Sequence, residues 1–419
     1  MCKYIHLYIF ILIISSINLN AQPINIKAKE IIEAYKNIQT IIDVNEKQYQ
    51  LQQLSTQWLA IILQTEYKNA SHDNTTLKSI VSNDGKYEIY YFPFIVNENA
   101  HIDYFVRDLV DEAPIAFYFS DVVIKKTKHP INIENIKLSF HESTIENNLK
   151  IHELRFLDST NPIAYERISD VTLKCLFEAM ALAQTNSEKD LINSTIINRL
   201  NKIWIQPIWF ENRMHGIYRM FTLLSPDKKF KVITWNIEYS DGSHRFFGAA
   251  ISHKPDKSLS VNLLTDKTGY IRSPERMSLT PKKWYGAIYY EIVQTEFKKQ
   301  TYYTLLGYKG NDEFTKIKLI ETVNLLYNGE PHFGSPILAK SVGYYNRLIF
   351  EFSATTNMML QYDQELKQIV CDNLTPSNPA YKDNYRFYGP DFSYNSYRFI
   401  KGKWELTQDT DLRNPKAEK

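Results

Sequence analysis

One short stretch contains the residue types of a nucleophile and its base. In SPDKKFKVITW, which begins at Ser225, a serine stands three residues before Lys228. A lysine amine can take the proton of a serine hydroxyl, and S-x-x-K is a spacing at which enzymes pair the two. The triplets SVN at Ser260 and KTG at Lys267 follow along the chain. The alternative interpretation of Ser-Pro-Asp-Lys-Lys is a tight turn that leads into a β-strand.

The order of these three motifs is that of penicillin-binding enzymes and β-lactamases, but their surroundings favour the turn. In those enzymes the serine begins a helix, and its lysine lies one turn further on the same face. Here Pro226 and Asp227 are turn residues, and KFKVITW alternates in the manner of a strand. Residues 225–269 are also too few to hold a helical domain between the first two motifs. The sequence therefore predicts a turn at Ser225.

Other signatures of catalysis and metal binding are missing from the sequence. His141 and His152 each precede a glutamate, but neither has a second histidine four residues on, as a zinc protease helix requires. There is no G-x-S-x-G, Walker loop or dinucleotide fingerprint, so we expect no metal and no cofactor. The two carboxylates of a glycosidase are paired in space, which spacing does not reveal. Candidate members of such a pair are Asp241, Glu321, Glu351 and Asp391.

The strongest binding candidate is RFYGPDFSYNSYRF at residues 386–399. Aromatic faces beside a carboxylate can stack on sugar rings and hydrogen-bond their hydroxyls. The candidate residues gather around an expected turn at Gly389-Pro390, with Asp391 as the acceptor and four aromatic neighbours: Tyr388, Phe392, Tyr394 and Tyr397. The alternative is a long loop whose aromatic residues anchor it to a sheet.

Composition excludes some classes of function. The chain has 419 residues and a net charge of +2, which gives no basic field for nucleic acid. It contains 29 Tyr and 22 Phe, residues that favour pleated, half-buried surfaces, so we expect extensive sheet. Sugar-binding platforms are a second explanation of this enrichment, and the bias of an AT-rich genome is a third.

The N-terminus has the form of a secretory signal peptide. Lys3 precedes an apolar stretch at residues 8–17, and NLNAQ follows, which predicts cleavage after Ala21. The apolar stretch is short for a membrane span of about 20 residues. We therefore expect an exported, soluble protein of the periplasm or the extracellular space, with no transmembrane segment in the mature chain. Cys175 and Cys371 then remain as the mature cysteines, and one disulfide between them is an open alternative.

The hydrophobic pattern predicts helices and strands in different parts of the chain. Apolar stripes at helical spacing occur at residues 26–67, and again in DVTLKCLFEAMALAQ, where Ser169 or Asp170 is the expected cap. A second helix follows, with Ser187 and Asp190 at capping-box spacing and Pro207 as its stop. Strand patterns fill much of residues 82–157, and twelve further strands are expected between residues 217 and 408.

These elements predict an α+β protein. Its expected parts are a signal peptide, a mixed helix and strand domain, and an antiparallel β-rich domain, at residues 1–21, 22–210 and 211–419. SNDGKYEIYYF at Ser82 aligns with SPDKKFKVITW and resembles the hairpin turn of β-propeller blades, but two copies do not establish a repeat. A propeller-like meander, an open barrel and a sandwich all fit the β-rich domain.

One resemblance covers residues 229–406. KFKVITWNIEYSDGSHRFFGAAI, WYGAIYYEIV, YYTLLGYKGND, RLIFEFSATTNMMLQYD with IVCDNL, and YGPDFSYNSY with GKWEL resemble uncharacterised secreted proteins of Bacteroidetes bacteria. That family has no known activity, so the resemblance implies bacterial export and gives no residue a role.

The sequence thus favours a non-catalytic binding or envelope-associated module whose ligand is a glycan or a cell-envelope protein. The main alternative is a secreted hydrolase that acts on glycan or peptide through acid and base carboxylates dispersed over several strands. A third possibility is a protein-binding module, in which the N-terminal helices leave an apolar stripe uncovered at Ile31, Ile38 or Trp58.

Overall fold

A computed structural model describes residues 34, 37, 78–81, 87–96, 99–108, 120–124, 136–145, 149–158, 161–183, 185–340, 342–408 and 410. The expected signal peptide and the apolar stripe at Ile31, Ile38 and Trp58 lie outside these residues. The chain divides into two compact units: Met1–Arg199 with Met214–Ile217, and Leu200–Arg213 with Tyr218–Lys419. The domain boundaries expected from the sequence stay a prediction.

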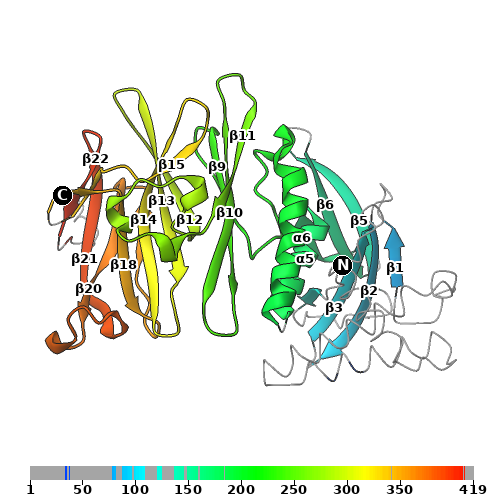
Figure 1. Ribbon diagram of the computed structural model, residues 1–419. Helices are drawn as coiled ribbons and strands as arrows, with labels where there is room; N and C mark the ends of the chain where they lie inside the picture. Colours follow the sequence, from blue (N-terminus) through cyan, green and yellow to red (C-terminus); the bar gives the residue numbers. More distant parts are fainter. Residues whose placement is uncertain are drawn as a thin grey trace, which may run out of the picture. The chain divides into compact units, whose positions relative to one another are not determined.

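The first unit contains two antiparallel sheets (Figure 1). One has four strands in chain order: β1 (Lys78–Val81), β2 (Tyr87–Val96), β3 (Asn99–Asp108) and β4 (Ser120–Ile124). The other has three: β5 (Ile136–Ile145), β6 (Leu149–Asp158) and β7 (Asn161–Ile168). Each strand pairs with the next one along the chain, so these sheets are built from short hairpins.

Two described helices follow β7, and their start signals are local. α5 (Val171–Leu182) is capped by Asp170, whose Oδ1 accepts a hydrogen bond from the Leu173 N–H at 2.7 Å, as expected. The same carboxylate binds Arg199 of α6 (Asn186–Trp204) at 2.8 Å. The expected capping box of α6 is wrong, because Ser187 already lies inside the helix.

The capping box of α6 is formed two residues earlier. The Thr185 N–H donates to Glu188 Oε2 at 3.1 Å, and the Glu188 N–H donates to Thr185 Oγ1 at 3.2 Å. This reciprocal pair satisfies two backbone groups that a helix start otherwise leaves without partners. The helix ends at Trp204, before a 3-10 turn that begins at Pro207.

The second unit contains three sheets, of four, five and six strands. The first is the meander β8 (Phe221–Leu224), β9 (Phe230–Glu238), β10 (His244–His253) and β11 (Leu259–Thr265). The second contains β12 (Ile288–Phe297), β13 (Gln300–Gly310), β14 (Thr315–Leu325), β15 (Pro331–Phe333) and β18 (Arg347–Ser353). The third has the order β17 (Tyr344–Tyr345), β16 (Leu338–Ala339), β22 (Lys403–Thr407), β21 (Tyr388–Ile400), β20 (Gln368–Pro376) and β19 (Leu360–Asp363).

The middle sheet of the second unit lies between the other two (Figure 1), and each of its faces contributes to a buried core. Side chains alternate between the two faces of a strand. On β13, Leu305 belongs to a core shared with β9 and β10, and the next residue, Leu306, belongs to a core shared with β20–β22. On β14, Leu319 likewise belongs to the first of these cores and Ile320 to the second. The apolar face of each outer sheet is therefore covered by the middle one.

The described chain is mostly β, so the expected α+β class is wrong for it. The antiparallel β-rich character of the C-terminal half is confirmed, and all twelve strands expected there are present, together with the short strands β15, β16 and β17. None of the sheets in the described residues closes on itself. Within the same residues, no helix has the length and apolarity to cross a membrane.

Candidate functional site

The Ser225 motif is a turn, as expected. The Ser225 hydroxyl donates to Asp227 Oδ1 at 2.6 Å and accepts from the Phe230 N–H at 3.0 Å. Lys228 has a positive φ of 54°, and its ammonium pairs with Glu211 at 2.7 Å rather than with the serine. Because the hydroxyl and the amine are both held by other partners, they do not form a nucleophile and its base.

The KTG triplet belongs to a different polar cluster, which the sequence did not reveal. Thr268 Oγ1 lies 2.7 Å from Asp266 Oδ1 and accepts a 2.7 Å bond from Lys309 Nζ. Lys309 also donates to the carbonyls of Tyr285 at 3.1 Å and Gly286 at 3.0 Å. Burial lowers the pKa of Lys309 to about 8. Each of the three hydrogens of the Lys309 ammonium has an oxygen acceptor, so these hydrogen bonds link the loop after β11 to β13.

A second buried cluster surrounds Glu321 on β14. Glu321 and Arg347 are both 0% exposed, with Arg347 Nε donating to Glu321 Oε1 at 2.7 Å. The other carboxylate oxygen accepts from the Tyr289 hydroxyl, which itself accepts from Trp284 Nε1 at 2.8 Å. Arg347 Nη1 donates to the Pro274 carbonyl. Such a pair is closed to solvent and offers no access to a substrate.

The carboxylates that the sequence singled out for acid and base catalysis have structural partners. Hydrogen bonds from Ser243 lower the pKa of Asp241, which lies in the turn between β9 and β10. Glu351 accepts from Thr315 Oγ1 at 2.9 Å. Glu321 is held by Arg347, and Asp391 by Ser393 and Asn373, so each of the four has a structural role in a turn, a strand pair or an ion pair.

The predicted binding residues lie on β21, not in a loop. Gly389-Pro390 is part of the strand, paired with Thr375 and Leu374, so the expected turn there is wrong. Tyr397 is only 4% exposed, and burial raises its pKa, so it is a core residue beside Trp404. Tyr388 and Tyr394 are half-buried.

The strand bulges between Pro390 and Tyr394. Asp372 lies opposite Tyr394 and Leu374 lies opposite Pro390, so one residue of β20, Asn373, faces three residues of β21. Asp391 stabilises this bulge: its Oδ1 accepts from the Ser393 N–H at 3.0 Å, and its Oδ2 from Asn373 Nδ2 at 2.7 Å. Partial burial opposes ionisation, but these hydrogen bonds lower the pKa of Asp391.

The bulge presents Phe392 to solvent. This side chain is 91% exposed, and its φ of 69° lies in the left-handed region, which costs a non-glycine residue about 1–2 kcal/mol. Bulges commonly redirect one side chain in this manner. An exposed phenylalanine on a strained backbone makes this bulge a candidate contact surface.

More aromatic residues precede β21, and two of them, Tyr381 and Tyr385, lie outside the candidate stretch at residues 386–399. Tyr381 stacks on Phe387 with ring centroids 4.1 Å apart, and Tyr385 lies 5.0 Å from Tyr388. We define the aromatic surface as these residues together with Arg386 and Phe314: Phe314, Tyr381, Tyr385, Arg386, Phe387 and Tyr388. The signal was available as YKDNYRFY, which has four aromatic residues within eight positions.

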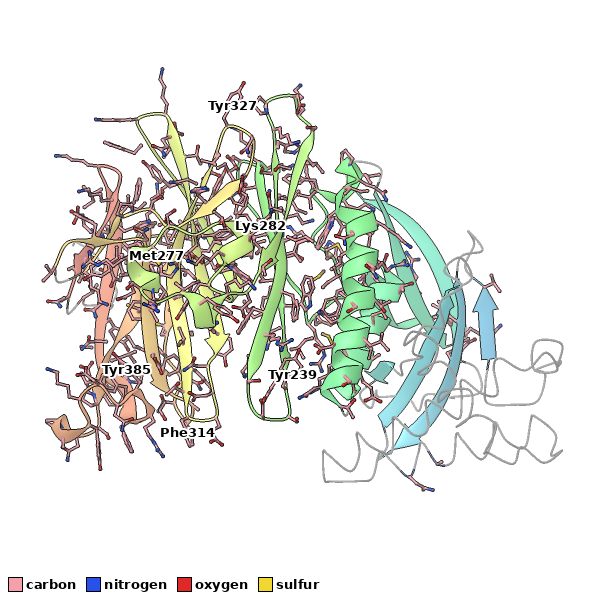
Figure 2. All side chains as sticks on the ribbon, viewed as in Figure 1. Tyr239, Met277, Lys282, Phe314, Tyr327 and Tyr385 are labelled. Atoms are coloured by element: carbon pink, nitrogen blue, oxygen red, sulfur yellow. The ribbon has the colours of Figure 1, made fainter. Side chains whose placement is uncertain are left out.

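Arg386 connects the two segments of the aromatic surface. Its guanidinium lies 4.8 Å from the Phe314 ring centroid and 5.2 Å from that of Phe387. Phe314 is 47% exposed and Tyr385 is 40% exposed. Figure 2 shows Phe314 and Tyr385 at the same end of the second unit. Phe392 follows Tyr388 by four residues, about 13 Å of extended strand, so one extended ligand could contact both.

Metal and thiol chemistry have no site among the described residues. No group of three or more His, Cys, Asp or Glu there is arranged to hold a metal ion. Cys371 is buried and free, so it forms no disulfide with Cys175. Burial raises the pKa of its thiol to about 12, which makes it a packing residue rather than a nucleophile.

Comparison with known proteins adds little. No family model and no curated protein matches the sequence. An α-L-arabinanase of Cellvibrio cellulosa in complex with arabinohexaose is 10% identical, with 62% of this chain and 76% of that chain covered and a TM-score of 0.14. A mutant of the Cellvibrio cellulosa arabinanase is also 10% identical, with 61% and 75% covered and a TM-score of 0.15. These scores do not establish a common fold, and we base no argument on them.

Proposed function

We propose that this chain is an exported, non-catalytic glycan-binding protein that holds sugar rings on the aromatic surface and on Phe392. The observation that supports this most strongly is Phe392, whose ring is 91% exposed on a bulge that Asp391 and Asn373 stabilise. A strained backbone that places an aromatic ring in solvent reduces stability, unless the ring has a partner in the functional state.

The chemistry beside these rings suits a sugar. The apolar face of a sugar ring packs on an aromatic side chain, while its hydroxyls need donors and acceptors. Asn373 and Asn395, linked by a 3.2 Å hydrogen bond, lie next to the bulge and supply both, and Asp391 supplies carboxylate oxygens. Arg386 supplies an exposed guanidinium on the aromatic surface. Aromatic stacking with a few polar groups at its edge is the usual composition of a small-ligand site.

A hydrolase is supported less well. Glycoside hydrolysis needs one carboxyl group as acid and a second as base or nucleophile, both facing the scissile bond. Glu321 is enclosed with Arg347, and Glu351 is bonded to Thr315. These contacts favour the binding role over the catalytic alternative.

We also infer that the second unit is propeller-like rather than a sandwich. Each of its sheets contains an antiparallel meander, β8–β11, β12–β15 or β19–β22. The edge strand β12 of the middle sheet packs against both β8 and β19, the edge strands of its neighbours. Adjacent edge strands of successive sheets are the arrangement of propeller blades. Turn surfaces at the ends of such blades are common places for ligand sites.

Binding to a glycan array, followed by titration calorimetry with each hit, tests the proposed function. We expect Phe392→Ala and Tyr385→Ala each to weaken binding by about tenfold, since truncation of a residue that anchors an interface typically costs more than about 1 kcal/mol. Tyr327→Ala is the matched control, because Tyr327 is 88% exposed but lies in the turn between β14 and β15. Parent and variants must show the same thermal unfolding.

Two outcomes would overturn the proposal. One is a parent protein that binds no glycan, and the other is equal binding by the parent and both surface variants. Capture of a cell-envelope protein that depends on Phe392 and Tyr385 would assign the same surface to a protein ligand instead. A Tyr397→Ala variant does not test the site, because Tyr397 is buried and its loss changes the core.

A further inference from the structure

A basic segment lies between β11 and β12. Residues 267–283 contain five basic residues and one acidic residue, Glu275. The ammonium of Lys340 pairs with Glu275 at 2.7 Å. The net charge of this segment is therefore larger than the net charge of +2 of the whole chain. Residues 267–283 therefore carry a net positive charge on a chain whose other residues are slightly acidic.

The five basic side chains are exposed and have no carboxylate partner among the described residues. None of them forms one of the ion pairs found there, which involve Arg199, Lys228, Lys340 and Arg347. The five residues are Lys267, Arg272, Arg276, Lys282 and Lys283. Figure 2 shows Lys282 well apart from Phe314 and Tyr385, which mark the aromatic surface.

The backbone beneath these charges is firmly attached to the unit. Leu279 is 1% exposed and exchanges two backbone hydrogen bonds with Phe333, at 2.7 and 2.9 Å. Trp284 is fully buried, and Arg347 donates to the carbonyls of Pro274 and Met277. Because this backbone is already fixed, little conformational entropy is lost when a ligand binds, and the charges are preorganised for binding.

Two of the cations lie against tyrosine rings. The Lys267 ammonium is 5.5 Å from the ring centroid of Tyr270, which is 79% exposed. The Arg276 guanidinium is 3.6 Å from the ring centroid of Tyr345. A ring beside a cation suits an acidic sugar, whose apolar face packs on the ring while its carboxylate or sulfate meets the cation.

We propose that the basic segment binds an acidic polysaccharide, one that carries carboxylate or sulfate groups along its chain. Membrane association fits less well, because the large apolar side chains Ile271, Leu279 and Trp284 are buried and cannot insert into lipid. Nucleic acid also fits less well, because proteins that bind it usually have a pI above 9 and this chain has a pI of about 8.1. The proposal does not depend on the aromatic surface.

Binding of the full chain to immobilised polymers tests this proposal. The polymers are polygalacturonate, which is a polycarboxylate, dextran sulfate, and neutral dextran of matched length. We expect binding to one or both acidic polymers and none to neutral dextran, with an affinity that falls steeply as salt rises. The polymer that binds more tightly distinguishes carboxylate from sulfate as the recognised group.

Lys282→Glu with Lys283→Glu should weaken binding by about tenfold or more, because two cations that face the polymer become anions. Lys298→Glu with Lys299→Glu is the matched control: these adjacent, exposed lysines lie in the turn between β12 and β13, and the control should change binding less than about twofold. Equal losses in both double variants would overturn the proposal, as would no binding to either acidic polymer.

Stronger binding to phosphatidylserine vesicles or to duplex DNA than to both acidic polymers would also overturn it. Phe392→Ala keeps this test separate from the proposed function, because that variant should leave acidic-polymer binding unchanged. The Lys282 and Lys283 double variant should in turn leave binding through the aromatic surface unchanged.

Discussion

Replacing Arg347 by methionine should strongly destabilise the second unit. The guanidinium and the Glu321 carboxylate are both 0% exposed, and the pair is joined through Nε and Oε1 at 2.7 Å. Without Arg347 the carboxylate keeps only the Tyr289 hydroxyl as a hydrogen-bond partner. Breaking a buried pair in this way typically costs about 3–5 kcal/mol, because one charge is left in a medium of low polarity. We expect the same loss for Glu321→Leu.

The double variant, Glu321→Leu with Arg347→Met, should lose much less. It leaves no buried charge, and apolar replacements of similar volume are often neutral. What remains is the loss of hydrogen bonds to the Tyr289 hydroxyl and the Pro274 carbonyl, about 1–3 kcal/mol in total. The two single losses therefore should not add, and the coupling between the two positions should be several kcal/mol.

Urea unfolding followed by tryptophan fluorescence measures these differences. All tryptophans except Trp58 belong to the second unit, so the signal reports mainly on that unit. Equal m-values are required before midpoints are compared. Single losses below about 1 kcal/mol, or a double variant equal to the sum of the singles, would refute the reasoning from charge burial.

Three further predictions concern other parts of the chain. Burial lowers the pKa of Lys231 to about 7. Between that pH and its ordinary pKa near 10.5, the unfolded chain binds a proton at Lys231 that the folded chain does not, so stability should rise with pH. Lys231→Met should reduce this rise between about pH 6.5 and about pH 9.5 in urea unfolding, and the rise that remains should come from Lys309, whose pKa burial lowers to about 8. Gly286→Ala should destabilise the protein by more than about 2 kcal/mol, because the φ of Gly286 is +67° and a Cβ there would lie 2.6 Å from Asp266. Gly343→Ala should cost about 1 kcal/mol in the same assay, because Gly343 has a φ of +79° but a Cβ there would lie in open space. Mass spectrometry of the exported protein should find Gln22 as its first residue, and an intact N-terminus would contradict the signal-peptide prediction.

Much of the local structure could be predicted from the sequence, because its causes are local. The turn at Ser225 follows from Ser, Pro and Asp, whose side chains or fixed φ satisfy a reversal of the chain within a few residues. Alternating apolar residues predicted all twelve expected strands of the second unit. The cap of α5 followed from Asp170, whereas that of α6 was misplaced because two overlapping pairs had the same spacing, at Thr185 and at Ser187.

The candidate site was predicted only in part, because exposure is not a local property. Both Phe392 and Tyr397 were candidate binding residues on the sequence alone, yet Phe392 is 91% exposed and Tyr397 is 4% exposed. The bulge at residues 391–393 interrupts the alternation of β21, and a shift of one residue moves a side chain to the opposite face. No spacing in the sequence identifies which three residues lie opposite Asn373.

The sequence by itself determined the turn at Ser225, the twelve strands expected between residues 217 and 408, and the α5 cap, since each depends on neighbours a few residues away. Only the tertiary structure decided which side chains meet. It brought Arg386 against Phe314, enclosed Glu321 with Arg347, and left the lysines of residues 267–283 without acidic partners in the part of the chain that the structure describes. The physical reason is that these contacts and exposures depend on how distant strands pair and pack, and strand pairing joins residues that no local pattern relates.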